Sequence, residues 1–111
     1  MRWNEIKSIQ ELDDLKELSK NEPVLLFKHS TRCSISSAAK GRMERHWDEK
    51  NANNPKPIYL DLIAFRDVSN KIAVDFNIEH QSPQVLLIKD GNCVFNSSHS
   101  EIDYAEILQH C

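Results

Sequence analysis

The stretch from Val24 to Ser36 constrains the fold of this chain more than any other. It begins with an apolar run, Val24 to Phe27, that is typical of a buried strand. A polar turn and Cys33 follow, and a helical pattern begins immediately after this cysteine. A cysteine in this position lies at the helix N-terminus, where free backbone N–H groups and the helix dipole favour a thiolate over a thiol. With Arg32 as a positive neighbour, the sequence predicts that Cys33 is a reactive nucleophile.

The residue three positions after Cys33 separates two kinds of thiol chemistry. A dithiol redox site has the frame Cys-x-x-Cys, whereas here the fourth position is Ser36. A thiolate at Cys33 can attack a disulfide, but no neighbouring thiol can resolve the mixed disulfide that forms. The frame therefore predicts monothiol exchange, with the second thiol supplied from elsewhere. The alternative is that Cys33 is inert and packs as a small hydrophobic residue.

Length, charge and composition exclude several classes of protein. The chain has 111 residues, enough for one domain, 1–111, with a real core. Its net charge of −3 gives no general reason to bind nucleic acid or an anionic membrane. No segment approaches the roughly 18 apolar residues of a transmembrane helix, and the N-terminus lacks the apolar region of a secretory signal. We therefore expect a cytoplasmic protein with no nucleic-acid or membrane partner.

The number and spacing of the cysteines argue against structural roles for them. The three cysteines, Cys33, Cys93 and Cys111, are an odd set, unlike the dense, even set of a secreted scaffold. None lies at zinc-ligand spacing from another, so no metal is expected. Cys93 falls within an expected strand as a small buried thiol. Cys111 is expected to be exposed and frayed, either a distant resolving thiol or a residue without a role.

Hydrophobic periodicity divides the chain into alternating helices and strands. The expected helices are those that follow a capping box at Ser8, begin after Cys33, span about 68–76, and follow a second cap at Ser100. The expected strands are 24–29, 58–62, the segment that Pro83 opens, and 92–97. Two parallel strands followed by a hairpin at Asp90-Gly91 give a mixed four-stranded sheet with helices on both faces. This order predicts an α/β, thioredoxin-like fold.

The helix after Cys33 has two distinct faces. The apolar residues expected to face the core are Ile35, Ala38, Ala39, Met43 and Trp47. The opposite face carries the basic residues Lys40, Arg42, Arg45 and Lys50. This charged run is either a solvated helix face or a positive rim that attracts an anionic thiol compound to the cysteine.

Several polar residues near the turn have both a functional and a structural interpretation. Pro83 is tolerated at a strand start, but a cis Ser82–Pro83 bond would place a free backbone beside the thiol, where an incoming thiol compound could pair with it. Ser36 either donates a hydrogen bond to the sulfur or is a small polar residue near the helix cap. His29 and His80 are interpreted as structural residues.

Several separated motifs, in order along the chain, resemble the monothiol bacilliredoxin family of the thioredoxin superfamily. The motifs are Phe27-Lys28-His29-Ser30-Thr31-x-Cys33-x-Ile35-Ser36, Arg66, Ser69-Asn70, Ile78-x-His80-x-Ser82-Pro83-Gln84, Ile88-x-Asp90-Gly91 and Asn96-x-Ser98-His99. The match spans nearly the whole chain. Ser34 stands where the family often has a proline, and Arg32 often has a neutral counterpart.

The resemblance implies a thioredoxin fold and thiol–disulfide exchange with bacillithiol, a small thiol that carries glucosamine and malate. By analogy, Cys33 would take bacillithiol from a protein mixed disulfide, and a second bacillithiol or another reductase would release it. The implied partners are bacillithiolated client proteins, and Pro83 matches the cis-proline of the superfamily. The candidate site is Cys33 with, in supporting positions, Arg32, Ser34, Ser36, Ser82 and Pro83.

Two other functions remain open on the sequence. A glutaredoxin-like binding module would hold an iron–sulfur cluster between two subunits through the same cysteine. Such proteins usually show Cys-Gly-Phe-Ser, whereas Ser34 and Ile35 stand here. The third possibility is an interaction protein that keeps the thioredoxin fold without redox chemistry.

Overall fold

The computed structural model describes residues 1–111 and follows the predicted alternation of helices and strands. The α-helices are α1 (Ile9–Leu18), α2 (Ser34–His46), α3 (Arg66–Phe76) and α4 (Tyr104–Gln109). The strands are β1 (Asn4–Glu5), β2 (Val24–His29), β3 (Lys56–Asp61), β4 (Gln84–Lys89) and β5 (Asn92–Ser98). A short 3-10 helix, His99–Glu101, follows β5. None of the helices is long and apolar enough to cross a membrane.

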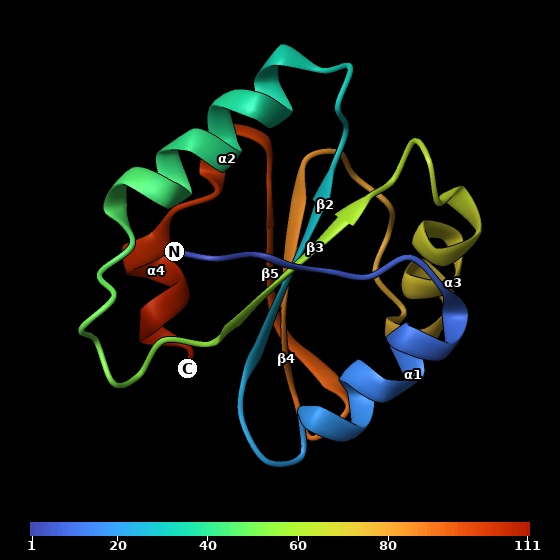
Figure 1. Cartoon of the computed structure of the whole chain (residues 1–111), viewed down its shortest axis with the longest axis horizontal. Coiled ribbons are helices and arrows are strands. Elements are labelled where there is room, and N and C mark those ends of the chain that lie inside the picture. Colours follow the sequence, from blue (N-terminus) through green and yellow to red (C-terminus); the bar gives the residue numbers. More distant parts are fainter.

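All the strands form one mixed sheet in the order β1-β3-β2-β4-β5 (Figure 1). β2 pairs in parallel with β3 and antiparallel with β4, and β4 and β5 form the predicted hairpin. This arrangement confirms the thioredoxin-like α/β fold. The sheet has five strands rather than the four predicted, because β1 adds a short parallel pairing with β3. β1 comprises two exposed residues, so the sequence has no apolar pattern there to predict a strand.

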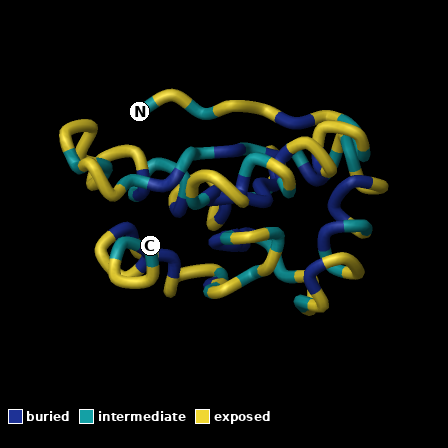
Figure 2. The backbone as a smooth tube through the Cα atoms, turned by 90° about the horizontal axis from the view of Figure 1, so that it is seen from below, coloured by how far each residue is buried: buried dark blue, intermediate teal, exposed yellow.

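The helices cover both faces of the sheet, and β2 lies at its centre (Figure 1). Every residue of β2 is buried, and successive side chains point to opposite faces. Leu26 belongs to the core under α1 and α3, whereas Phe27 belongs to the core under α2 and α4. Figure 2 shows the buried residues concentrated between the outer layers. Because β2 leads directly to Cys33, this buried strand fixes the position of the candidate nucleophile.

Three local signals in the sequence produce the caps and the turn that the structure shows, and those at Ser8 and Asp90-Gly91 were predicted. Ser8 caps α1, because its hydroxyl accepts a hydrogen bond from the Glu11 backbone N–H at 3.1 Å. Asn77 ends α3 in the left-handed conformation, with φ 53°. Asp90 and Gly91, with φ 52° and 74°, both take the positive φ of a tight hairpin turn.

Two helix predictions are wrong in detail. In α2, Ile35 is 57% exposed and Ala38 is exposed, while Ser36 is fully buried with Ala39 and Met43. The helix is therefore rotated so that a serine, which finds hydrogen-bond partners at the sheet, faces inward in place of the isoleucine.

The last helix also begins later than predicted. Ser100 lies in the 3-10 helix, and α4 starts after the N-cap residue Asp103. As a consequence, Tyr104 and Ile107 are buried, whereas Ala105, expected to face inward, is exposed.

Candidate functional site

Cys33 is the N-cap residue of α2 and follows β2 through a tight turn. Its backbone N–H donates to the Ser30 carbonyl at 3.2 Å, and its own carbonyl accepts from the Ser37 N–H at 3.1 Å. The residue is partly exposed, so an external disulfide can approach the sulfur. The turn and the first helical turn thus hold the thiol at the end of a helix that favours negative charge. Arg32 and Ser34, on either side of Cys33, are both exposed.

Ser36 fastens the turn to the sheet instead of facing the sulfur with a free hydroxyl. Its Oγ accepts a hydrogen bond from the Ser30 N–H at 3.0 Å and lies 2.6 Å from His29 Nδ1. Burial, with the nearby Lys40 ammonium, lowers the pKa of His29. The Ser36 hydroxyl therefore joins the Ser30 backbone to the His29 ring. Of its two interpretations, this favours the small polar residue near the cap.

Replacing Ser36 with alanine is expected to lower the free energy of unfolding by about 1–3 kcal/mol, because it leaves the buried Ser30 N–H and His29 Nδ1 without partners. Urea denaturation measures the change. The matched control is Ser37→Ala at the next, exposed position, which should shift stability by no more than about 0.5 kcal/mol. Equal effects of the two substitutions would show that the hydrogen bonds of Ser36 to Ser30 and His29 contribute nothing to stability.

The Ser82–Pro83 peptide bond is cis, as the family resemblance implied. Register pairing of Lys28 with Gln84 places this bond beside the end of β2, next to the turn that carries Cys33. The Pro83 carbonyl accepts from the His99 N–H at 3.0 Å. Neither the N–H nor the carbonyl of Ser82 has a hydrogen-bond partner in the chain. The free backbone predicted for a cis bond is therefore present.

The loop before Pro83 is held by the buried side chain of Gln84. Its Nε2 donates to the Glu79 carbonyl at 3.0 Å, and its Oε1 accepts from the Gln81 N–H at 3.3 Å. These bonds fix the loop that also contains His80.

A buried lysine joins this loop to β2, a feature that the sequence reasoning missed. Lys28 is completely buried, and its Nζ lies 2.8 Å from His80 Nδ1. Burial lowers the pKa of Lys28 to about 8. Partial desolvation of its ring lowers the pKa of His80, and so do the nearby charges of Lys28 and Arg66. A lysine directly after the apolar run, within a strand expected to be buried, was the available signal, because a charged residue is rarely buried without a purpose or a partner.

The basic face of α2 is only partly available as a positive rim. The Lys40 ammonium pairs with Glu44 at 2.6 Å, and the Arg42 guanidinium donates to the Ile102 carbonyl at 3.0 Å. These contacts favour the interpretation of this face as an ordinary solvated helix surface. By contrast, Arg32 and Arg66 form no ion pair.

The other two cysteines lie away from Cys33. Cys93 pairs with Ile88, which pairs with Val24, so it lies about 16 Å along the sheet from the end of β2 that leads to Cys33. Cys111 packs on the opposite face of the sheet from Cys93 and is half-buried rather than frayed. It is close enough to Lys89, at the far end of β4, for that positive charge to act on the pKa of its thiol. Burial raises the pKa of both thiols. Neither is placed to resolve a mixed disulfide at Cys33 within the same molecule.

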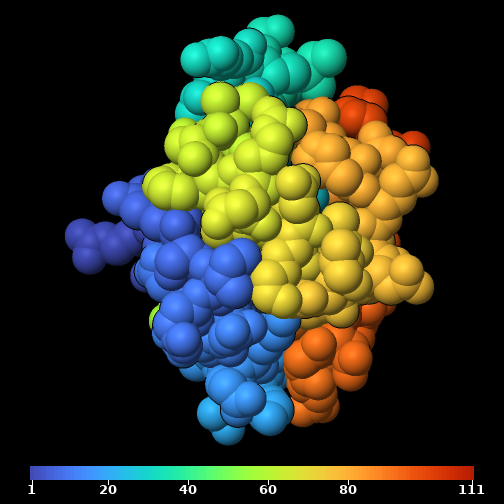
Figure 3. Space-filling view, turned by 90° about the vertical axis from the view of Figure 1, so that its right-hand side faces the viewer, coloured from blue at the N-terminus to red at the C-terminus, as the bar shows by residue number.

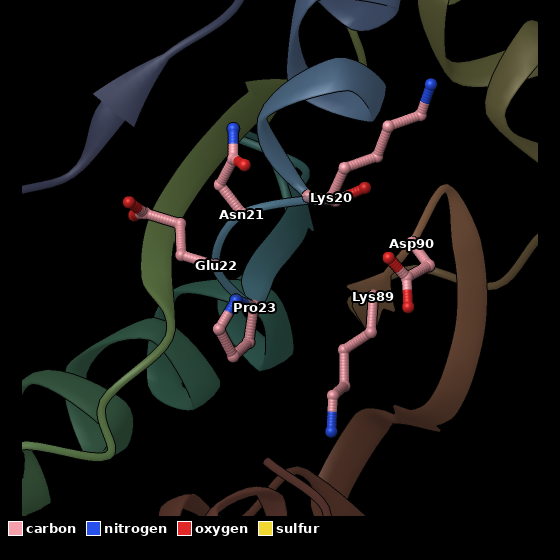
Figure 4. A pocket seen from close by; sticks show the side chains of 7 residues that line it. Lys20, Asn21, Glu22, Pro23, Lys89 and Asp90 are labelled. Carbon is pink, nitrogen blue, oxygen red and sulfur yellow. The ribbon is translucent and has the colours of Figure 1, made fainter.

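The one pocket of the structure lies at the opposite end of the sheet from Cys33 (Figure 4). It is a shallow, open depression between the start of β2 and the end of β4. Its lining residues are Ser19, Lys20, Asn21, Glu22, Pro23, Lys89 and Asp90. No group of three or more His, Cys, Asp or Glu side chains is placed to hold a metal ion. The candidate chemistry therefore concentrates at the turn around Cys33.

Comparison with known proteins agrees with this geometry. A solved structure with a thioredoxin fold, for which an oxidoreductase activity has been suggested, is 29% identical and superposes with a TM-score of 0.83 over 96% of this chain and 91% of its own. Thioredoxin from Malassezia sympodialis, at 15% identity, has a TM-score of 0.76 over 98% of this chain and 90% of its own. Thioredoxin from Fasciola hepatica, also at 15%, has a TM-score of 0.74 over 97% of this chain and 99% of its own. At such low identity, the two thioredoxins show the fold alone.

The family model of the monothiol bacilliredoxin BrxC matches residues 4–107, almost the whole chain. Together with the thioredoxin fold and the 29% identical relative, this match supports a thiol redox role. The matched region includes the partly exposed cysteine at the start of α2, the serine at the fourth position of its frame and the cis-proline loop. The chain therefore belongs to the monothiol bacilliredoxin family.

Proposed function

We propose that this protein is a monothiol thiol–disulfide oxidoreductase that removes bacillithiol from mixed disulfides on cytoplasmic client proteins. The observation that carries the proposal is the isolation of Cys33, which is accessible at the start of α2 while Ser36 occupies the position of a resolving cysteine. An isolated thiol of this kind accepts one small-thiol adduct and keeps it until an outside thiol arrives.

In the first step, the Cys33 thiolate attacks the bacillithiol sulfur of the client's mixed disulfide. The client S–S bond breaks, a new S–S bond forms between Cys33 and bacillithiol, and the client leaves as a thiolate that takes a proton from water. In the second step, a free bacillithiol thiolate, or the thiolate of another reductase, attacks the adduct. Cys33 is released as a thiolate, and the small thiol leaves in a new disulfide, so electrons and sulfur bonds balance.

The residues around Cys33 have supporting roles in this proposal. The unpaired N–H and carbonyl of Ser82 offer strand-like hydrogen bonds to the incoming thiol compound. Ser36 holds the turn in place through Ser30 and His29. Arg32, which is exposed beside the nucleophile and forms no ion pair, attracts an anionic adduct.

Intact-mass spectrometry tests the proposal directly. The reduced protein is mixed with a bacillithiolated model peptide and, separately, with the same peptide carrying glutathione. We expect a mass gain of one bacillithiol and a slower gain of glutathione, with one adduct per chain. Absence of an adduct from either peptide would contradict the enzyme function, and faster transfer of glutathione would contradict the assignment of bacillithiol as co-substrate.

A further inference from the structure

The buried ammonium of Lys28 has no anionic partner in the protein. Its Nζ lies 2.8 Å from His80 Nδ1, and Lys28 takes part in no ion pair. Removing a charge from water without a counter-ion is costly, so buried charges are normally paired. The charge of Lys28 would therefore be stabilised by an anion bound at the His80 ring, on the side that faces away from Lys28.

The contact with Lys28 determines which nitrogen of His80 carries the proton. An ammonium can only donate, so Nδ1 accepts from Lys28 and the proton of the neutral ring is on Nε2. His80 is exposed, whereas Lys28 is completely buried. The ring therefore offers an N–H donor to solvent with a positive charge behind it, an arrangement suited to an anion.

One residue at the start of α3 adds to this arrangement. Arg66, the first residue of α3, is exposed, forms no ion pair and is near enough to His80 to lower its pKa. Figure 3 shows the yellow-green segment that enters α3 beside the orange loop that precedes β4.

This cationic group lies at the same end of the sheet as Cys33. Ser30 lies two extended residue steps after Lys28, and a hydrogen-bonded turn joins Ser30 to Cys33, so the Cα atoms of Lys28 and Cys33 are at most about 14 Å apart. His80 also belongs to the loop that carries Ser82 and Pro83. A small thiol bonded at Cys33 can therefore extend one arm toward His80.

We propose that His80 and Arg66, with Lys28 behind them, form an anion subsite that binds a carboxylate of the small thiol carried on Cys33. In bacillithiol this group is the malate. The inference rests on the proposed function and adds a second recognition point, separate from the sulfur chemistry. His80 and Arg66 contact the carboxylate as donors. Lys28 is a positioning residue that fixes the ring of His80 and places a buried positive charge behind it.

Exchange kinetics with two adducts on one peptide test the subsite. The peptide carries either bacillithiol or uncharged 2-mercaptoethanol, and the double variant Arg66→Gln/His80→Ala is compared with wild type. We expect the double variant to react at least about tenfold more slowly with the bacillithiolated peptide, and within about twofold of wild type with the uncharged adduct. The control Arg45→Gln removes an exposed positive charge at the far end of α2 and should leave both rates unchanged.

The position of Lys28 is tested by the ¹⁵N chemical shifts of the His80 ring. Wild type should show the Nε2–H tautomer, and Lys28→Met should show a mixture of both tautomers together with a partial loss of the preference for the bacillithiol adduct. Unchanged ring shifts in Lys28→Met would overturn the positioning role of Lys28. A general loss of stability would not by itself change the tautomer, so the ring shifts report on positioning alone.

The outcomes separate this inference from the proposed function. If wild type accepts bacillithiol but the double variant slows equally with both adducts, or with neither, the subsite is overturned and the proposed function stands. If wild type accepts no bacillithiol, the proposed function fails, and titration of S-methyl bacillithiol against the His80 ring shifts decides the subsite. A saturable shift that is lost in Arg66→Gln supports the subsite, whereas no shift overturns it.

Discussion

Replacement of Cys33 by serine is expected to lower the rate of exchange with a bacillithiolated peptide by at least about a thousandfold. The reaction requires a nucleophile that attacks a disulfide and then becomes part of a new one. At neutral pH a serine hydroxyl does not attack a disulfide, and its oxygen cannot form an S–S bond. The rate constant is obtained under pseudo-first-order conditions by measuring, with chromatography, how fast the free peptide thiol is released. Because Cys33 is partly exposed and makes only backbone hydrogen bonds, the serine variant should fold normally.

The control for this experiment is the double variant Cys93→Ser/Cys111→Ser. Both thiols lie at the far end of the sheet, and the pKa of each is raised by burial. We expect the double variant to keep the wild-type rate within about twofold, since distant sites act independently. Loss of exchange in the double variant, with retention in Cys33→Ser, would place the nucleophile elsewhere and overturn the proposed function.

Replacement of Lys28 by methionine is expected to raise the free energy of unfolding at pH 7 by about 3 kcal/mol. Burial lowers the pKa of Lys28 from 10.5 to about 8, so folding disfavours the charged form that predominates at pH 7. Methionine fills a similar volume without a charge, and the exposed His80 ring can then accept a hydrogen bond from water. The expected gain is the desolvation cost that the wild-type ammonium carries.

The same substitution should change how stability depends on pH. Below pH 8, Lys28 is protonated in both the folded and unfolded states, so wild type bears the full cost. Between about pH 8 and 10.5, the unfolded chain binds this proton more than the folded chain does, so wild-type stability rises with pH. Above this window both states are neutral and the cost disappears. The difference between wild type and Lys28→Met should therefore shrink across the window, as measured by urea denaturation.

Lys7→Met is the matched control, because Lys7 is exposed and its side chain forms no ion pair. It should change stability by no more than about 0.5 kcal/mol at any of these pH values. A Lys28→Met variant that is less stable than wild type at pH 7 would show that the ammonium is compensated within the fold. A lysine retained despite its cost is what the anion subsite requires, since binding sites commonly trade stability for function.

The sequence predicted the parts of the fold that depend on local patterns. Strand β2 ends at His29 as expected, α2 begins directly after Cys33, and Asp90 takes the positive φ of the predicted hairpin turn. These outcomes follow from steric and hydrogen-bonding rules that operate over a few residues. The position of the candidate nucleophile was therefore predictable, as was the cis Ser82–Pro83 bond once the family was recognised.

The parts that were missed depend on contacts between distant segments. The rotation of α2 that buries Ser36 rather than Ile35 is set by hydrogen bonds to the end of β2. Lys28 and His80 are 52 residues apart, and each looked structural or unremarkable alone. Periodicity describes one element at a time, so it cannot show that a buried lysine on one strand meets a histidine in a loop before another.

The placement of Cys93 and Cys111 on opposite faces, both far from Cys33, also determines how such a molecule behaves over time. An adduct on Cys33 has no internal exit, so its lifetime depends on the concentration of thiol outside the protein and not on any motion of the chain. The fraction of molecules that carry an adduct then rises when that supply falls and declines when it recovers. The fraction of protein that carries the adduct would thereby report the concentration of free thiol around it.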